Sequence, residues 1–307
     1  MLYNLSDTSP EARQWFRRSD VRAALEYLRH PTYVGADAQI ALPHLSISVH
    51  DLALAFEIGL GPVKHPVKVP AGIGASWFGV ETEQSVTDSA TLHELLWRVR
   101  PRLLIEVGTM CGGSACFFAK TMMGYDPSAR VVTIDRKHPS ERGNKCVRKT
   151  QCFGSPLWST LQASGNMRPI WSDVSNASVL SELRSEAARA APGAVMVVDD
   201  ASHAALPTIE HFWALEGLVT PGSYYLVEDT RLDADCAASI LTMPPGSVYW
   251  YCRRLQAEGG PARAVANLTA TPAFRAAWRQ DRSVERWAIT QHPGGYLRRR
   301  PKRQAMA

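Results

Sequence analysis

Apolar and polar residues alternate most regularly in the middle of the chain. Apolar runs of strand length occur there, with helical segments between most of them; the runs cover residues 103–107, 131–134, 168–171, 194–198 and 223–227, and the helical segments cover 114–123, 176–190 and 203–217. Nearly continuous apolar strands separated by helices indicate a parallel sheet that is covered on both faces. The sequence therefore predicts an α/β fold with a doubly wound, mostly parallel sheet.

The flanking segments are predicted to contain helices and loops. Further helical patterns occur at residues 9–31, 50–61, 87–101 and 273–280. The Pro- and Gly-rich residues 61–79 are expected to form a loop, and an apolar run covers residues 287–290. We expect an N-terminal helical and loop extension over residues 1–85, an α/β domain over 86–299 and a basic tail over 300–307. The extension is interpreted as a lid or a contact between subunits.

The charge of the chain is concentrated at its C-terminal end. The net charge is +5, and 45% of the 307 residues are hydrophobic, as in an ordinary globular protein. Five basic residues lie between positions 298 and 303; without them 29 basic residues remain, from a total of 34, against 29 acidic ones. The body is thus nearly neutral, which argues against a broad nucleic-acid-binding face. The basic tail itself is interpreted as a solvated terminus, a localisation signal or a contact for an acidic partner.

No segment of the sequence resembles a membrane span or a signal peptide. The longest apolar runs are far shorter than the roughly 20 residues that a helix needs to cross a bilayer. The N-terminal stretch MLYNLSDTSPEARQWF lacks the basic start and apolar core of a secretory signal. We therefore expect a cytoplasmic protein that does not act on a membrane.

The six cysteines show no pattern typical of a metal site. They occur at positions 111, 116, 146, 152, 236 and 252, without a CxxC pair. In a cytoplasmic chain of this length, such cysteines are expected to be free thiols. A bond between Cys146 and Cys152, which are close in the sequence, is the alternative.

The stretch IEVGTMCGGSACFF, residues 105–118, carries three glycines directly after the first strand. In an open parallel sheet, ligands bind at the carboxyl ends of the strands, near the point where the strand order reverses. Gly108, Gly112 and Gly113 would let the chain turn sharply and approach a ligand, while Ser114 and nearby amides at the helix start would face an anionic group. A purely structural turn followed by a helix cap is the alternative.

An acidic residue follows the second strand at the position that suits a ribose. Asp135 lies 27 residues after Gly108, where its carboxylate would accept hydrogen bonds from both ribose hydroxyls. A dinucleotide site would prefer the pattern GxGxxG, but Met110 occupies the middle glycine position. Glu106 instead suits the ammonium group of an amino-acid-like ligand. S-adenosyl-L-methionine carries both a ribose and such an ammonium group, so it fits better than a nicotinamide dinucleotide, and Asp173, after the third strand, is expected near its adenine.

Carboxylates also follow the fourth and fifth strands. Asp200 ends the run VMVVDD, and Glu228 and Asp229 end the run SYYLVED. Three close carboxylates would raise one another's pKa unless a cation neutralises them. A hard divalent ion, Mg²⁺ before Ca²⁺ or Mn²⁺, is the expected ligand. Caps and solvated strand ends are the alternative for each acidic site taken alone.

A histidine lies next to this predicted metal site. His203 follows Asp200 by three residues, and an imidazole has a suitable pKa for a general base. Asp199 precedes Asp200 and is the alternative metal ligand at this strand end. A metal-bound hydroxyl of a substrate would be acidified, and His203 would then take its proton.

These motifs together resemble a known family. The stretches SWFGVETEQSVTDSATLHELLWRVRPRLLIEVGTMCGGSA, VVDDASH, GSYYLVEDT and RWAITQHPGGYLRR are similar to those of the cephalosporin hydroxylase-like, or rhamnosyl O-methyltransferase-like, family of class I methyltransferases. The resemblance covers roughly residues 75 to 299. It implies a Rossmann-like methyltransferase fold, S-adenosyl-L-methionine and Mg²⁺ as cofactors, and a homo-oligomeric assembly.

The resemblance also implies a role for each matching position. It assigns cofactor binding to Gly108, Gly112, Gly113, Ser114 and Asp135, metal binding to Asp200, Glu228 and Asp229, and the catalytic base to His203. We expect Glu106, Thr109 and Asp173 to complete the cofactor site, and Asp200 to act in catalysis with His203. The implied activity is metal-dependent O-methylation of a small hydroxylated acceptor, such as a sugar, another natural product or a phenol. A nicotinamide-dependent oxidoreductase, a metal-dependent hydrolase and a methyltransferase-like binding protein without activity are the alternatives.

Overall fold

The computed structural model describes residues 39–42, 45–48, 75–82, 84–142, 146, 152–234, 236–237, 250–285 and 290–301. The helices predicted within residues 9–31 and 50–61 lie outside these ranges, as do residues 287–289 of the last apolar run. These two predicted helices of the N-terminal extension therefore stay predictions.

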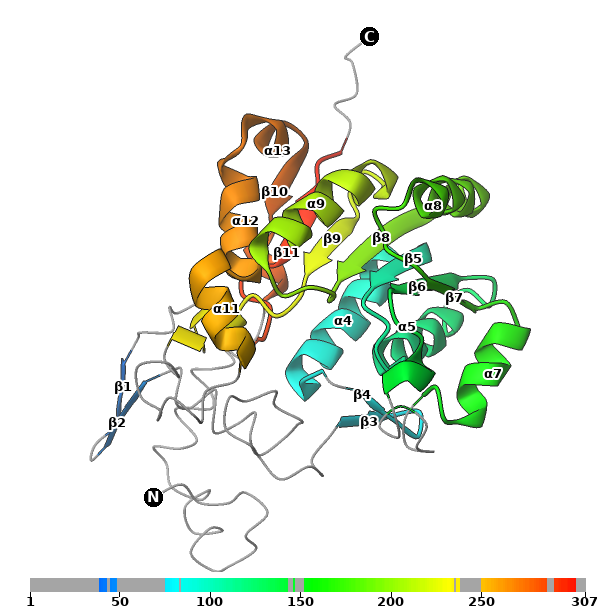
Figure 1. Ribbon diagram of the computed structural model, residues 1–307, viewed down its shortest axis with the longest axis horizontal. Helices are drawn as coiled ribbons and strands as arrows, with labels where there is room; N and C mark the ends of the chain where they lie inside the picture. The colour runs from blue at the N-terminus through cyan, green and yellow to red at the C-terminus, as the bar shows by residue number, and fades with distance from the viewer. Residues whose placement is uncertain are drawn as a thin grey trace, which may run out of the picture.

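The main sheet has seven strands in the order β10-β11-β9-β8-β5-β6-β7 (Figure 1). Its parallel strands are β5 (Pro101–Val107), β6 (Arg130–Asp135), β7 (Met167–Trp171), β8 (Ala194–Asp199) and β9 (Tyr224–Val227). The predicted strands are confirmed, with ends shifted by at most two residues. Strand β5 pairs in parallel with both β6 and β8, so the strand order reverses at β5. A ligand crevice is expected at the carboxyl ends of these central strands.

Helices cover both faces of the sheet, as predicted (Figure 1). One apolar core packs the sheet against α4 (Val86–Val99), α5 (Gly113–Met123) and α7 (Pro156–Ala163). The other packs it against α8 (Ala177–Ala190), α9 (Ala205–Leu215), α12 (Pro261–Ala270) and α13 (Pro272–Ala277). Because side chains alternate along each strand, both cores draw on the same strands: Leu104 faces the first core, and Leu103 and Ile105 face the second. The α/β doubly wound fold is therefore confirmed.

The C-terminal edge of the sheet differs from the prediction. The expected helix over residues 273–280 stops at Ala277, and β10 (Trp278–Gln280) follows it directly. This strand pairs antiparallel with β11 (Tyr296–Arg299), which pairs antiparallel with β9. The partner strand lies further along the chain, so local spacing gave no sign of the pairing.

Two short hairpins precede the main sheet in the chain, in a region predicted as helix and loop. They are β1 (Gln39–Leu42) with β2 (Leu45–Ser48), and β3 (Ala75–Trp77) with β4 (Val80–Thr82). Strand β3 lies inside the expected loop over residues 61–79, so that part of the prediction is wrong. Strand β4 packs against α5, and this contact stabilises a segment whose sequence alone favours turns.

Several shorter elements complete the described chain. They are the helix α11 (Trp250–Glu258) and the 3₁₀ helices η1 (Pro139–Arg142), η2 (Glu216–Leu218) and η3 (Arg282–Val284). Across the described ranges, no helix combines the length and the apolar content that a membrane crossing requires.

The cysteines are not the free thiols that the sequence predicted. All six are paired, as Cys111–Cys146, Cys116–Cys152 and Cys236–Cys252. The paired residues are 35, 36 and 16 positions apart in the sequence. Only the folded chain brings them together, and the alternative pair Cys146–Cys152 does not form. Two of the three bonds join the glycine-rich stretch and α5 to the segment that follows η1.

Candidate active site

The predicted site residues gather at the carboxyl edge of the parallel strands. Glu106 lies in β5, Asp135 ends β6, Asp200 follows β8 and Glu228 follows β9. Parallel strands bring these ends to one edge of the sheet, which is where the sequence analysis expected the crevice.

The glycines of the loop after β5 permit close contacts with other parts of the chain. A Cβ atom on Gly108 would lie 2.2 Å from the carbonyl oxygen of Asp200, and one on Gly113 would lie 2.3 Å from that of Glu81. Gly108 also has a φ of +112°, which L side chains rarely adopt. These residues must be glycine for the loop to pack between β4 and the end of β8. The loop is therefore held directly against Asp200.

Glu106 is a buried carboxylate surrounded by hydroxyl groups. It is 1% exposed, and the Thr133 hydroxyl donates to its Oε2 at 2.5 Å. Ser114 also bonds to Glu106, and the Thr109 hydroxyl lies 2.6 Å from that of Thr133. Burial raises the pKa of Glu106 to about 8, although the bonds from Ser114 and Thr133 act in the opposite direction. A cationic group placed beside this carboxylate would restore its charged form.

Asp135 is hydrogen-bonded to the glycine loop and to a nearby arginine. Its Oδ2 accepts from the backbone N–H of Met110 at 3.0 Å and from Nη2 of Arg142 at 2.7 Å. Its Oδ1 accepts from the backbone N–H of Lys137 at 3.0 Å. Asp135 therefore anchors the loop in addition to the ribose role that the sequence predicts. Arg142 is a residue of this site that the sequence analysis did not single out.

Asp173 lies in a turn and is half-exposed. Its Oδ1 accepts from the backbone N–H of Ser175 at 2.9 Å and from the Ser175 hydroxyl at 2.6 Å. These bonds hold the pKa of Asp173 below its usual value. The arrangement is that of an ordinary Asx turn ahead of α8, so the predicted adenine contact stays a prediction.

Asp200, His203 and Asp229 form a compact group. Each offers one potential ligand atom, and these atoms all lie within 4.8 Å of one another. Nδ1 of His203 is 3.6 Å from Oδ2 of Asp229 and 4.0 Å from Oδ1 of Asp200. Two carboxylates and an imidazole at such distances are a suitable donor set for a divalent cation.

Three residues of the site have left-handed backbone conformations although they are not glycine. They are Met110, with φ +46°, His203, with φ +51°, and Asp229, with φ +55°. Such conformations are unfavourable for residues other than glycine, and they cluster at functional sites where the surrounding structure enforces them. Their position on three neighbouring loops marks this edge of the sheet as the best candidate for the active site.

The two consecutive aspartates after β8 have different surroundings. Asp199 accepts from the Tyr225 hydroxyl at 2.9 Å and lies 3.2 Å from Nδ1 of His211, on α9. Burial lowers the pKa of His211, but the bond to Asp199 and the charge of Asp199 outweigh it, so the pKa is raised. Asp200, not Asp199, is thus the residue that joins His203 and Asp229.

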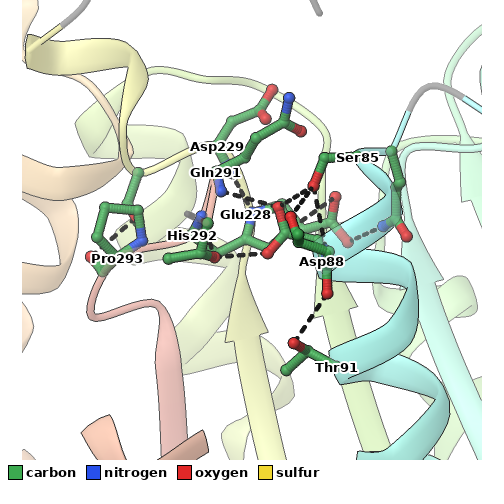
Figure 2. A network of polar contacts seen from close by, with 12 residues as sticks. Ser85, Asp88, Thr91, Glu228, Asp229, Gln291, His292 and Pro293 are labelled. Atoms are coloured by element: carbon green, nitrogen blue, oxygen red, sulfur yellow. Dashed lines mark hydrogen bonds and ion pairs between the residues drawn. The ribbon is translucent and has the colours of Figure 1, made fainter. Parts of the chain in front are cut away.

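Glu228 lies behind this group, in a buried polar network. Oε1 of Glu228 accepts from Nε2 of Gln84 at 2.6 Å, and its Oε2 lies 3.9 Å from Nε2 of His292. Figure 2 shows Glu228 between His292 and Asp88 of α4. Burial, followed by the charges of Asp200 and Asp229, raises the pKa of Glu228 well above its usual value. Glu228 is close enough to Asp200 and Asp229 to feel their charge, but it is not in the compact group.

The supporting residues of this network come from distant parts of the sequence. Asp88, in the first turn of α4, accepts from the Thr290 hydroxyl at 2.5 Å and from the backbone N–H of Gln291 at 2.8 Å. His292 accepts from the backbone N–H of Asp229 at 2.9 Å. The sequence analysis assigned no role to Gln84, Asp88 or His292. The one available signal was the stretch QHPGGY, whose paired glycines suggest a tight backbone contact.

Comparison with protein families gives one match that spans most of the chain. The model described as "Rhamnosyl O-methyltransferase/CmcI" matches residues 73–300. The match begins just before β3 and ends just after β11. It therefore includes every residue of the candidate site. It also includes the hairpin β3–β4 and the C-terminal strands, which the sequence analysis did not predict.

The individual relatives share about a quarter of their residues or fewer with this chain. A rhamnosyl O-methyltransferase of Mycobacterium leprae is 27% identical over 158 residues, which are 52% of this chain and 61% of that protein. One of Mycobacterium tuberculosis is 26% identical over 158 residues, 52% of this chain and 58% of that protein. The chain thus spans about three fifths of the length of these relatives. Among solved structures, one of CmcI with Mg and S-adenosyl-L-methionine is 21% identical and covers 81% of this chain and 95% of that chain, with a TM-score of 0.47.

Proposed function

Because the chain belongs to the rhamnosyl O-methyltransferase/CmcI family, we propose that it is an O-methyltransferase that uses S-adenosyl-L-methionine and a divalent metal ion. One observation carries this proposal. The glycine loop is in direct contact with Asp200, since a Cβ on Gly108 would lie 2.2 Å from its carbonyl oxygen. A methyl donor held by the loop would therefore lie beside the group of Asp200, His203 and Asp229.

The residues around the glycine loop fit S-adenosyl-L-methionine. Glu106 is a buried carboxylate whose neighbours are hydroxyls of Thr133 and Ser114, so the ammonium group of the cofactor would supply the missing positive charge. Asp135 would hold the ribose, while its bond to the Met110 amide keeps the loop in place. Gly108, Thr109, Gly112, Gly113 and Ser114 would line the methionine part of the cofactor, and Asp173 would lie near the adenine.

The carboxylates after β8 and β9 fit a divalent metal. Asp200 and Asp229 offer oxygen ligands in one compact group with His203. Burial raises the pKa of Glu228, and the charges of Asp200 and Asp229 raise it further. A cation beside these carboxylates would relieve their repulsion and favour the ionised form of Glu228. We propose that Asp200, Glu228 and Asp229 would hold the ion.

The chain's own residues would position the acceptor and move one proton. When bound, the cofactor supplies the methyl group and the metal lowers the pKa of an acceptor hydroxyl. His203 would accept the hydroxyl proton; its Nδ1 faces Asp200 and Asp229, so the proton is taken at Nε2. The two carboxylates would stabilise the imidazolium that results. The remaining contribution is to align the nucleophilic oxygen with the methyl group.

We propose a hydroxylated small molecule as the acceptor. The curated relatives are named rhamnosyl O-methyltransferases, so a hydroxyl of a glycosyl group is the first acceptor class to test. A homo-oligomeric state, a cytoplasmic location and a lid or contact role for residues 1–85 remain predictions from the sequence.

A thermal-shift experiment tests the cofactor proposal. S-adenosylhomocysteine and NAD⁺ would each be added with Mg²⁺ and with a chelator. A ligand at about 100 times its dissociation constant stabilises the folded state by about 2.7 kcal/mol, which raises the unfolding midpoint of a chain of this size by several degrees. We expect a shift with S-adenosylhomocysteine and none with NAD⁺. A shift with NAD⁺ alone would reject the proposed function.

A further inference from the structure

Asp229 lies in a strained turn directly after β9. Its φ of +55° is in the left-handed region that residues other than glycine rarely adopt. The turn places Glu228 in the buried network with Gln84 and places Asp229 within reach of His203. A strained conformation persists only where neighbouring groups enforce it, so the contacts that hold this turn decide the geometry of the proposed metal site.

One of these contacts comes from a buried histidine. The backbone N–H of Asp229 donates to Nδ1 of His292 at 2.9 Å, and His292 is 0% exposed (Figure 2). Because Nδ1 accepts, the ring hydrogen is on Nε2. That nitrogen lies 3.9 Å from Oε2 of Glu228 and 3.9 Å from Oδ2 of Asp88. The His292 ring thus contacts the backbone of one proposed ligand and faces the side chain of another.

The segment that carries His292 is fixed on both sides of the turn. The backbone N–H of Val227 donates to the Gly295 carbonyl at 3.0 Å, and that of Arg231 donates to the Gln291 carbonyl at 3.0 Å. The Thr230 hydroxyl donates to the Pro293 carbonyl, also at 3.0 Å. A Cβ on Gly295 would lie 2.1 Å from the Val227 carbonyl oxygen, so this close approach requires glycine. The position of the His292 ring is therefore determined by the backbone.

We propose that His292 is a positioning residue of the metal site: its Nδ1 holds the Asp229 turn in the conformation that brings the Asp229 carboxylate to Asp200 and His203. This inference rests on the proposed function, since it concerns the metal that the function requires. His292 acts through Asp229 and does not itself touch the metal or the substrate. Partners behind metal ligands typically contribute about 10- to 100-fold in metal affinity.

Two polar substitutions of His292 separate this role from a general packing role. In His292→Asn the amide oxygen can occupy the position of Nδ1 and accept the Asp229 N–H, whereas in His292→Gln the longer side chain carries its amide to the position of Nε2. We expect His292→Gln to weaken Mn²⁺ binding, measured by titration calorimetry, by about 10- to 100-fold. We expect His292→Asn to stay within about threefold of the wild-type affinity, well below the loss expected for His292→Gln.

Thr230→Val is the matched control. It removes one hydrogen bond between the same two segments but leaves the bond between Asp229 and His292 intact. We expect it to lower the unfolding midpoint while Mn²⁺ affinity remains unchanged. Equal Mn²⁺ affinity of His292→Gln and His292→Asn would overturn the inference, as would a loss of affinity in Thr230→Val as large as in His292→Gln.

Binding of S-adenosylhomocysteine in the presence of a chelator distinguishes the inference from the proposed function. All three variants should bind it as the wild type does, because among the described residues the His292 ring makes its hydrogen bond and close ionic contacts with Asp229, Asp88 and Glu228 and not with the glycine loop. A wild-type protein that bound neither Mn²⁺ nor S-adenosylhomocysteine would refute the proposed function, and the inference with it. A wild type that bound both, with no effect of His292→Gln, would refute the inference alone.

Discussion

The candidate site has two halves that are built from the sequence in different ways. The cofactor half consists of Glu106 in β5, residues 108–114 in the loop after β5 and the start of α5, and Asp135 at the end of β6. These elements follow one another directly in the sequence. The metal half consists of Asp200, His203, Glu228 and Asp229, and its support comes from residues 84–88 and 290–295. The cofactor half can thus be recognised from a short stretch of sequence, whereas the metal half depends on the complete fold, including the antiparallel C-terminal strands.

The largest expected effect belongs to the metal half. His203→Ala should lower turnover of a glycosyl acceptor by about 10²- to 10⁴-fold, the usual contribution of a general base. The affinity of His203→Ala for S-adenosylhomocysteine, measured by calorimetry, should equal that of the wild type if the two halves of the site act independently. An unaltered turnover would rule out His203 as the base.

His203 also belongs to the compact group that could bind the metal, so the same variant needs a second measurement. A base beside the metal should leave Mn²⁺ affinity close to that of the wild type. A large loss of Mn²⁺ affinity in His203→Ala would instead identify His203 as a ligand, and the proposed base would have to be another residue.

A smaller effect than the loss of turnover in His203→Ala is expected when Asp200 is changed. This effect is on metal binding, and the neighbouring Asp199 provides the matched control. Asp200→Asn should weaken Mn²⁺ binding by more than the roughly 10- to 100-fold that an outer partner contributes, because it removes a direct ligand. Asp199→Asn should leave Mn²⁺ affinity unchanged, since Asp199 is hydrogen-bonded to Tyr225 and lies beside His211. The reverse result would show that the two aspartates have been assigned to the wrong roles.

The fold was predictable where the sequence pattern is local. The parallel strands β5 to β9 are nearly continuous apolar runs, and the structure confirms them, as the comparisons confirm the predicted family. The helix expected over residues 273–280 was wrong beyond Ala277, because β10 exists through its pairing with β11. The three disulfides were missed for the same reason, since the paired cysteines are 16 to 36 positions apart. The hairpin β3–β4 is local, but it packs against α5, which its own sequence does not indicate.

The site shows the same limit at the level of single residues. The carboxylates and glycines at strand ends were recognisable, because parallel strands must bring their carboxyl ends to one edge. Gln84 and His292 could not be found in this way, because they reach Glu228 and Asp229 from segments 144 and 63 positions away in the sequence. The choice between Asp199 and Asp200 required the direction of each side chain, which strand alternation supplies only once the strand end is known.

The smallest expected effect concerns the pH dependence of the cofactor half. Burial raises the pKa of Glu106 from 4.5 to about 8. Between these values the folded state keeps a proton on Glu106 that the unfolded state releases, so the free energy of unfolding decreases as pH rises from about 4.5 to 8 and this contribution is constant above that range. Glu106→Gln, which cannot ionise, should lack this part of the pH dependence. Thermal unfolding of the two proteins across this range, with a chelator present, measures the difference.

Ligand binding should depend on Glu106 with the opposite sign. The ammonium group of S-adenosylhomocysteine favours the ionised carboxylate, so the affinity of the wild type should rise as pH increases toward 8. In Glu106→Gln the affinity should be lower by about 10- to 100-fold, since hydrogen bonds to charged groups contribute about 1.5–3 kcal/mol, and it should lack this rise. Mn²⁺ affinity should stay unchanged, which keeps the two halves separate. If the pH dependence of binding persisted in Glu106→Gln, the ammonium group would be held by another residue, and the division of the site into these two halves would have to be redrawn.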